Sequence, residues 1–460
     1  MTDVAGCLVH ALALVLLGSL IALPWRTSGD APGLAGLLGF SFLAGFFLET
    51  QLLFVLLVPG LPLGWAVGLL YAAAVPAGLW RTGRWLAQRR RCRPRPACRP
   101  RWFELGAGVI AAEKVVFALA LVLLTPALFD DPLQNWIGKG RALFLGVNWS
   151  WQPGDPAFLG FFGAGHYPLG LPIHRAVSAL LAGGWSDAVG RFDGVPLFLA
   201  ALAVLWATVR AVTDSRAVAA ACAVFFSTSP FQAWTMAIGN ADLAVQAFAT
   251  GATAAALAGR WFLCGVLAAG AGFMKNDGLL IALPAALVLV TLLQPWRTAP
   301  RRGAGQLLGF ALGAATLVPW LAFKSLYGLA AAPFALTFGW HADAPGQIWS
   351  KVIIGGTHGV FWLLLLPTLL ATLPRAVCSV PGRALLGSWT CCALILVFIF
   401  GCTNAYVFLE SEETIHRTAL QLYGLTVFCA GLGLGALPAA RVSPPLNARP
   451  PDRDPEPTPR

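Results

Sequence analysis

Two adjacent carboxylates, Asp130 and Asp131, stand where a long apolar run ends and a polar segment begins with Pro132. A carboxylate held at such a boundary can act as a general base and accept the proton of an attacking hydroxyl. An aspartate directly before a proline is also a favoured helix start. A capping carboxylate can still face a cavity, so both interpretations of Asp131 stay open.

Basic side chains recur in the polar segments that follow. Lys139 and Arg141 come soon after Asp131, Lys275 begins the motif KNDG between two apolar runs, and Arg417 precedes the last apolar run. Cations of this kind stabilise a leaving phosphate, an electrostatic contribution that is often the largest in catalysis. A lysine beside a tight Asp-Gly turn can instead extend its ammonium group to the membrane interface, which is the alternative for Lys275.

The segment 129–193 is predicted to contain two amphipathic helices that lie in the membrane interface. On the first helix the apolar face holds Leu133, Trp136, Ile137, Leu143 and Phe144. The polar residues on its other faces are Gln134, Asn135, Lys139 and Arg141. On the second the apolar residues are Ile173, Val177, Leu180 and Leu181, and Gly183-Gly184 ends the helix. These helices would position Asp131 at the edge of the lipid.

The composition requires a membrane protein. The chain has 460 residues, of which 58% are hydrophobic and only 11% charged, and its mean hydropathy is +0.72. A soluble domain carries roughly a quarter charged residues. The sequence therefore predicts an all-α polytopic bundle of about thirteen transmembrane helices. The expected spans are 6–25, 34–58, 61–80, 105–128, 194–212, 216–230, 241–258, 261–274, 278–294, 305–326, 357–373, 385–402 and 418–438.

Charge distribution orients the predicted bundle. The run 81–101 holds nine arginines between two apolar segments, which favours a cytoplasmic loop beside anionic lipid and not a nucleic-acid site. With this loop inside, alternation places the arginines of the later inside loops on the same side. The segments 129–193, 230–240, 275–277, 327–356 and 403–417 are then outside. The Pro-rich tail 441–460 is expected to be disordered and cytoplasmic, and the protein to lie in the plasma or inner membrane.

The sequence assigns no metal site. Cys92 and Cys98 lack a partner pair of Cys or His, and His166 and His174 lack the spacing of helical metal ligands. Glu49 lies within an apolar span, where it is costly unless it is paired. We expect it to be packed inside the bundle, although a proton-coupled transporter would also use such a residue.

Over residues 105–440 the chain resembles bacterial membrane glycosyltransferases of the GT-C class, the relatives of protein O-mannosyltransferases and lipid A aminoarabinose transferases. The motifs that carry the resemblance are D-x4-W-x2-K-x-R from Asp131 to Arg141, then Tyr167-Pro168-Leu169 with Pro172, Asn240-Ala241-Asp242-Leu243, Lys275-Asn276-Asp277-Gly278 and His416-Arg417. Residues 1–80, which hold three further spans, and the basic loop 81–104 lie outside it.

The resemblance implies a transfer of sugar from a polyprenyl-phosphate donor to an acceptor (a protein, a lipid or a glycan) on the outer face of the membrane. It implies that Asp131, or less favourably its neighbour Asp130, is the catalytic carboxylate. Lys275 and Arg417, and next Lys139 and Arg141, would bind the donor phosphate. The implied substrate-binding residues are Trp136, His166, Tyr167, Asn240, Asp242, Asn276, Asp277 and His416.

The chain departs from the family pattern at two places. The family has an acidic residue before the Tyr-Pro, where this chain has His166, and its paired acidic motif is shifted into Asp130-Asp131. These departures leave a divalent cation and the acceptor open. The competing hypotheses are a secondary transporter or lipid-linked substrate flippase, which should show matching repeats and ionisable groups near the bilayer midplane, and a non-catalytic scaffold.

Overall fold

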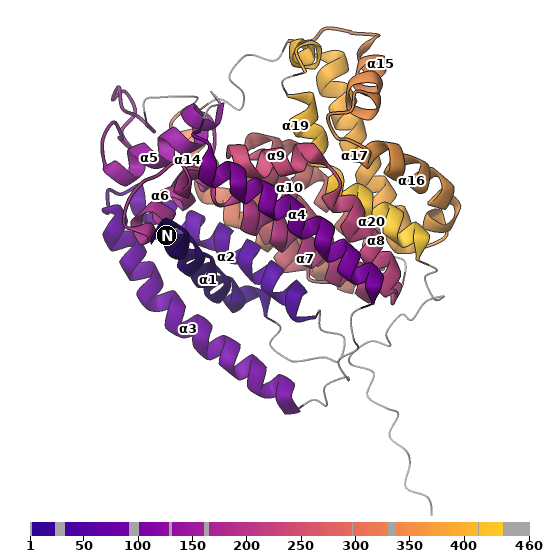
Figure 1. Cartoon of the computed structure of the whole chain (residues 1–460), viewed down its shortest axis with the longest axis horizontal. Helices are drawn as coiled ribbons and strands as arrows, with labels where there is room; N and C mark the ends of the chain where they lie inside the picture. The colour runs from indigo at the N-terminus through magenta and orange to yellow at the C-terminus, as the bar shows by residue number, and fades with distance from the viewer. Residues whose placement is uncertain are drawn as a thin grey trace, which may run out of the picture.

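The computed structural model describes residues 2–23, 33–91, 101–127, 131–160, 165–296, 298–329, 337–412 and 414–435 (Figure 1). Within these ranges the chain is helical, with no β-strand and two isolated bridges. The all-α class is therefore confirmed. Of the predicted basic loop 81–104, residues 81–91 belong to α3 and α4 begins at Trp102, while residues 92–100 and the C-terminal tail lie outside the described residues.

The first half of the chain contains α1 (Thr2–Ala22), α2 (Leu34–Leu57), α3 (Leu63–Arg91), α4 (Trp102–Leu124), η1 (Pro132–Ile137), α5 (Gly138–Leu145), α6 (Gly170–Ala182), η2 (Val189–Arg191), α7 (Gly194–Thr213), α8 (Arg216–Ser227) and α9 (Pro230–Ile238). The second half contains α10 (Asp242–Leu257), α11 (Trp261–Met274), η3 (Gly278–Ala282), α12 (Leu283–Leu293), α13 (Pro300–Ala314), η4 (Ala315–Leu317), α14 (Val318–Leu326), α15 (Ala344–Ile348), η5 (Trp349–Ile354), α16 (Phe361–Val377), α17 (Val380–Cys402), η6 (Asn404–Tyr406), α18 (Val407–Glu410), α19 (Ile415–Leu420) and α20 (Tyr423–Leu434).

Seven helical segments in the described ranges are long and apolar enough to cross a membrane, and an eighth arises if α8 and α9 form one span bent by 61°. The predicted count of about thirteen is not confirmed. Several predicted spans are helices of only 10–17 residues, such as α11 and α16. A straight crossing needs about 20 residues. Most of the segment 230–240, which was predicted to lie outside, forms the helix α9, capped by Ser229, and the side of the membrane on which it lies stays a prediction.

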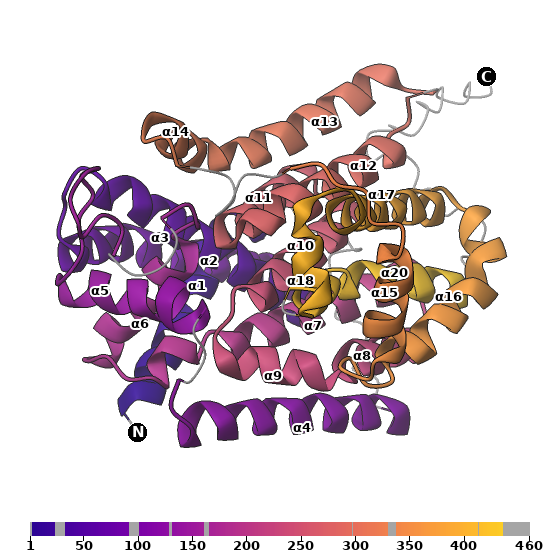
Figure 2. The ribbon, with the colours of Figure 1, turned by 90° about the horizontal axis from the view of Figure 1, so that it is seen from above.

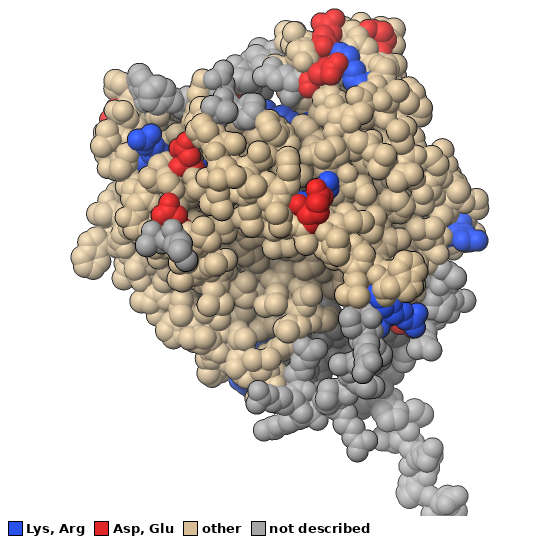
Figure 3. Space-filling view, in the orientation of Figure 1, with Lys and Arg blue, Asp and Glu red and all other residues tan. Residues whose placement is uncertain are grey.

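The helices pack around a buried centre. In Figure 2, α4 lies along one edge and α13 with α14 along the opposite edge, while α10 and α7 lie between them. Most of α10 is buried. The N-terminal helices belong to the same packed body, since α2 contacts α7 and α11 and α1 contacts α6. In Figure 3 the charged side chains on the face shown are few and scattered, with one acidic and basic group near its middle, and the sparse charge is expected of a surface that meets lipid.

Small residues let α1 and α2 approach closely. A Cβ atom on Gly45 would lie 1.8 Å from the Leu14 carbonyl oxygen, and one on Gly18 would lie 1.8 Å from that of Ser41. Close backbone contact of this kind is a common way for helices to associate in lipid. The two glycines therefore fix the crossing that brings the inner faces of α1 and α2 together.

Segments predicted on the cytoplasmic side share one end of the bundle. Arg81 Nη2 donates to the Leu23 carbonyl at 2.7 Å, and Arg260 donates to the Ala22 carbonyl. Arg216 forms an ion pair with Glu104 at the start of α4. These contacts agree with the predicted alternation of the spans, although the side of the membrane stays a prediction.

Candidate functional site

Asp242 is the centre of a network of charged side chains. It begins α10, is fully buried, and makes no capping hydrogen bond to the helix. Its Oδ2 accepts from Arg417 Nε at 2.7 Å, and its Oδ1 accepts from Lys275 Nζ at 2.8 Å and from Gln421 Nε2 at 3.4 Å. The carboxylate is thus held by two cations from distant parts of the chain and does not cap α10, whose N-cap residue is Ala241.

Asp131 joins this network through Arg417. Its Oδ2 accepts from Arg417 Nη2 at 2.5 Å, and its Oδ1 accepts from Asn135 Nδ2 at 2.7 Å. The carboxylate makes no capping hydrogen bond, and the residue already has helical backbone angles before Pro132. With 26% of its side chain exposed, Asp131 is the more accessible of the two aspartates that Arg417 bridges. Asp130 lies outside the described residues.

Lys275 completes the network on the side of the KNDG motif. Its Nζ also lies 2.8 Å from Asp277 Oδ2, and its side chain is 4% exposed. The lysine therefore does not extend to an interface, as the turn alternative would require. Extended backbone at Lys275 ends α11, and η3 starts at Gly278, where a Cβ would lie 2.2 Å from the Ala271 carbonyl oxygen.

We call Asp131, Asp242, Lys275, Asp277 and Arg417 the ion-pair cluster. Burial alone would lower the pKa of the Arg417 guanidinium, but Asp242 and Asp131 outweigh burial and hold it above its ordinary value. The pKa of Lys275 is raised in the same way against burial, by Asp242 and Asp277. Both groups stay cationic at any physiological pH, so the cluster contains two cations and three carboxylates.

Aromatic and basic side chains surround the cluster. The ring of Tyr167 lies 5.0 Å from that of Trp136 and 4.5 Å from that of His166. The His166 carbonyl accepts from Asn276 Nδ2 and from Lys324 Nζ, both at 3.3 Å. Burial, Lys139 and Lys324 lower the pKa of His166 to about 4, so its imidazole is neutral near pH 7.

Lys324 was missed by sequence reasoning. Its Nζ donates to Asn276 Oδ1 at 3.3 Å, and among the described residues it makes no ion pair within 4 Å of a carboxylate oxygen. In the sequence it is hidden at the end of an apolar span. The signal that could have found it is a lysine that follows Trp320 by one helical turn, where its ammonium lies 5.8 Å from the ring centre.

The two other predicted phosphate-binding residues differ from each other. Lys139 is fully buried, not directed to the interface, and burial lowers its pKa to about 8. The polar face predicted for the first amphipathic helix is therefore wrong at Lys139 and at Asn135, which is also buried. Arg141 is exposed and makes no ion pair with the cluster among the described residues.

The second predicted helix of the outward loop is confirmed as α6, which ends at Gly183 with φ +79°. It is buried on nearly all sides and does not lie along an interface. Arg175 pairs with Asp193 through Nε at 3.0 Å and Nη2 at 3.1 Å, and it donates to the Gly239 carbonyl at 2.8 Å. This places α6 against the turn that carries Asn240, a buried residue whose Oδ1 accepts no hydrogen bond from the described part of the chain.

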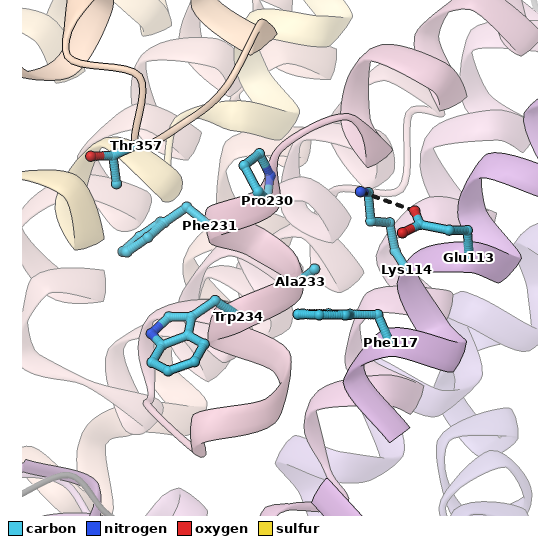
Figure 4. Close-up of a pocket in the computed structure, with 8 residues that line it drawn as sticks. All are labelled: Glu113, Lys114, Phe117, Pro230, Phe231, Ala233, Trp234 and Thr357. Carbon is cyan, nitrogen blue, oxygen red and sulfur yellow. Dashed lines mark ion pairs between the residues drawn. The ribbon is translucent and has the colours of Figure 1, made fainter. Parts of the chain in front are cut away.

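His416, next to Arg417, faces away from the cluster. Its Nδ1 lies 3.2 Å from His358 Nε2, and its Nε2 lies 3.5 Å from Thr357 Oγ1 and from Glu412 Oε2. Thr357 lines a surface pocket of about 390 Å³ with Phe231, Trp234 and the ion pair of Glu113 and Lys114 (Figure 4). This apolar pocket adjoins the candidate site through His416 and Phe231, whose rings lie 6.1 Å apart.

One group of side chains in the described ranges could hold a metal ion. His10, Glu49 and His174 each offer a ligand atom, and these atoms lie within 4.8 Å of one another. Glu49 is fully buried inside the bundle, as the sequence predicted. The sequence did not connect the three, because His174 was compared only with His166.

Comparisons with protein-family models, with curated proteins and with solved structures find no match to this chain.

Proposed function

We propose that the protein is an integral-membrane glycosyltransferase that transfers a sugar from a polyprenyl-phosphate donor to an acceptor hydroxyl, with Asp131 as the general base. The observation that carries the proposal is the ion-pair cluster. Arg417 and Asp131 are 286 residues apart, and they meet with Asp242 and Lys275 in one network. Four motifs whose order suggested the GT-C class thus supply a carboxylate and two cations to one place.

The proposed reaction makes one bond and breaks one. Asp131 accepts the proton of the acceptor hydroxyl, whose oxygen attacks the anomeric carbon of the donor sugar. The bond between that carbon and the phosphate oxygen breaks, and its electron pair leaves with the polyprenyl phosphate. Arg417, Lys275 and Lys324 stabilise the negative charge that develops on this phosphate.

The charges of the cluster couple these two events. With Lys324 included, three cations balance three carboxylates. Lys324 pairs with no carboxylate among the described residues, so it can contact the donor phosphate directly, while a second cation for the phosphate must first lose a carboxylate partner. Arg417 Nη2 contacts Asp131 and its Nε contacts Asp242. Protonation of Asp131 removes one of these two attractions just when the leaving phosphate gains charge. Arg417 can then donate from Nη2 to the phosphate while Asp242 holds its Nε in place.

The test is transfer of radiolabelled sugar from a polyprenyl-phosphate donor by the purified protein in lipid. Asp131→Asn should lower the rate at least about 10²-fold, because general-base catalysis contributes 10²–10⁴-fold. Asp155→Asn, an exposed aspartate of the same outward segment, is the matched control and should leave the rate unchanged. Full activity in a folded, inserted Asp131→Asn protein would remove Asp131 as the base.

The proposal places the site on the extracytoplasmic face of a plasma or inner membrane, within a GT-C-like core. The acceptor is a protein, a lipid or a glycan of the cell envelope. The donor tail would lie against the apolar faces of the spans, where large hydrophobic side chains such as Leu124 on α4 and Leu394 on α17 are exposed. A surface of that kind suits a polyprenyl chain better than water.

A secondary transporter or lipid-linked substrate flippase is the second candidate. It is favoured by one observation, the burial of Glu49 with His10 and His174 between helices of the bundle. Ionisable groups at such a depth are typical of ion-coupled transport. Counterflow of a polar solute in proteoliposomes, without sugar transfer, would favour this candidate over the enzyme.

A further inference from the structure

A compact group of three ligand-type side chains lies away from the ion-pair cluster, where α1, α2 and α6 meet. His10 Nε2 lies 2.8 Å from Glu49 Oε1, and His174 Nδ1 lies 3.3 Å from Glu49 Oε2. The three side chains are 1%, 0% and 5% exposed. A buried carboxylate needs a positively charged partner. Either a proton or a metal ion between the carboxylate and the imidazoles can supply that positive charge.

The Ser178 hydroxyl contacts both histidine residues of the group. Its oxygen lies 2.8 Å from His10 Nδ1 and 3.1 Å from the His174 carbonyl oxygen. When the hydroxyl donates to that carbonyl and the His10 proton is on Nδ1, the lone pair of Nε2 faces Glu49, which is the arrangement that a metal ion between them requires. The other tautomer places a proton on Nε2, between His10 and Glu49.

The surroundings have the features of an outer ligand shell. A metal-binding histidine almost always donates its other ring N–H to a nearby acceptor, and Ser178 Oγ, 2.8 Å from His10 Nδ1, is in the position of such an acceptor. The Glu49 carboxylate accepts from Tyr71 as well. A small cavity of about 10 Å³ adjoins the two histidines and is lined also by Cys7 and Asp193. That volume is close to what one water molecule requires.

We propose that His10, Glu49 and His174 bind a divalent transition-metal ion of the Zn²⁺ class, with a water in the adjoining cavity as the fourth ligand. Two imidazoles and one carboxylate are a donor set that Zn²⁺ uses in proteins. Zn²⁺ bonds of about 2.0–2.1 Å in a tetrahedron separate the ligand atoms by about 3.3 Å. The distances of 2.8 Å and 3.3 Å run to the two different oxygens of Glu49, and the ligand atoms of the three side chains lie within 4.8 Å of one another, so the side chains would move together to reach that geometry.

The metal would fasten the N-terminal helices to the outward loop, because α1 and α2 carry two ligands and α6 the third. It lies apart from the proposed transfer chemistry and does not depend on it. The competing occupant is a proton, which would make His10 an imidazolium paired with Glu49. Metal analysis separates these two states directly.

The experiment uses the full-length protein purified in detergent with a tag that contains no histidine. The protein is treated with chelator, equilibrated with Zn²⁺ and desalted, and its metal content is measured. We expect about one Zn²⁺ per chain in the wild type and less than a tenth of that in Glu49→Gln and His174→Asn. His341→Asn, a histidine that stacks on Tyr406 outside the group, should keep the full content.

X-ray absorption of the zinc-loaded wild type gives a second readout that does not need a variant. It should show two imidazole nitrogens and one carboxylate oxygen at about 2.0–2.1 Å. A wild type that takes up no Zn²⁺ would overturn the proposal in favour of the imidazolium. Uptake that survives in folded Glu49→Gln, or a spectrum with fewer than two imidazoles, would overturn it too.

Discussion

Lys139 carries an ammonium group into a fully buried position beside Trp149 and Gly160. Burial lowers its pKa from an ordinary 10.5 to about 8. Between these two pH values the unfolded chain holds a proton that the folded chain has released. The free energy of unfolding therefore rises with pH from about 8 to about 10.5, and below pH 8 the cost of burying the charge is present in full.

Lys139→Met should raise the thermal unfolding temperature at pH 7, because it removes that cost. The difference between pKa 10.5 and about 8 corresponds to roughly 3 kcal/mol. The gain over wild type should shrink as the pH approaches 10. The measurement is thermal unfolding in detergent from pH 7 to 10, with the exposed Arg141→Met as control. A gain that is the same at every pH would contradict the pKa of Lys139.

Residue types and their order were enough to predict the members of the ion-pair cluster, but not their pairing. Asp131, Asp242, Lys275, Asp277 and Arg417 were all predicted as site residues, while their contacts depend on how distant helices pack. The same limit hid the partners of Glu49, since His174 is 125 residues away. The burial of a charged side chain such as Lys139 cannot be predicted from the periodicity of a single helix.

The group of His10, Glu49 and His174 depends on the close crossing of α1 and α2, because these two helices carry His10 and Glu49. Helix bounds such as 261–274 were predicted because apolar runs and caps define them. The π-helical turns η1, η3 and η5 were not, because one extra residue in a turn leaves hydropathy almost unchanged. The bend between α8 and α9 was missed for a similar reason, since Pro230 can begin a helix as well as end one.

Gly45→Val should destabilise the protein by about 1–3 kcal/mol or more, because its side chain would be forced into the backbone of α1. Gly68→Val is the matched control, since a Cβ at Gly68 on α3 meets nothing within 4 Å. Both variants put a valine inside a helix, so the change in helix propensity cancels. Thermal unfolding of the two proteins in the same detergent measures the difference. Equal unfolding temperatures would contradict the close crossing.

Across the whole molecule, two separate groups of charged residues join segments that are distant in the sequence. Arginines predicted on the cytoplasmic side meet the end of α1, while the ion-pair cluster unites segments predicted outside. The composition predicted this all-helical bundle, while the alternation of its ends across the membrane stays a prediction. It did not predict how many helices cross completely, because several apolar helices are shorter than about 20 residues.

Reporter fusions expressed in a bacterium test the predicted orientation. Alkaline phosphatase fused after residue 155 should be active, because that segment is predicted outside, where the enzyme folds. Green fluorescent protein fused after residue 259 should be fluorescent in the cytoplasm, since Arg260 is predicted inside. The exchanged fusions, with each reporter at the other position, serve as controls and should be silent. The reverse pattern would invert the orientation and the side of the site.

The Arg417 bridge has a consequence for the order in which the protein is assembled. Synthesis runs from the N-terminus, so Asp131, Asp242 and Lys275 are in the membrane before α19 has been made. Until then Asp242 has Lys275 as a cation, while Asp131 waits for one that arrives 286 residues later. The ion-pair cluster is therefore completed by the last helices to insert, and a ribosome that stops before residue 415 leaves a bundle in which Asp131 has not met Arg417.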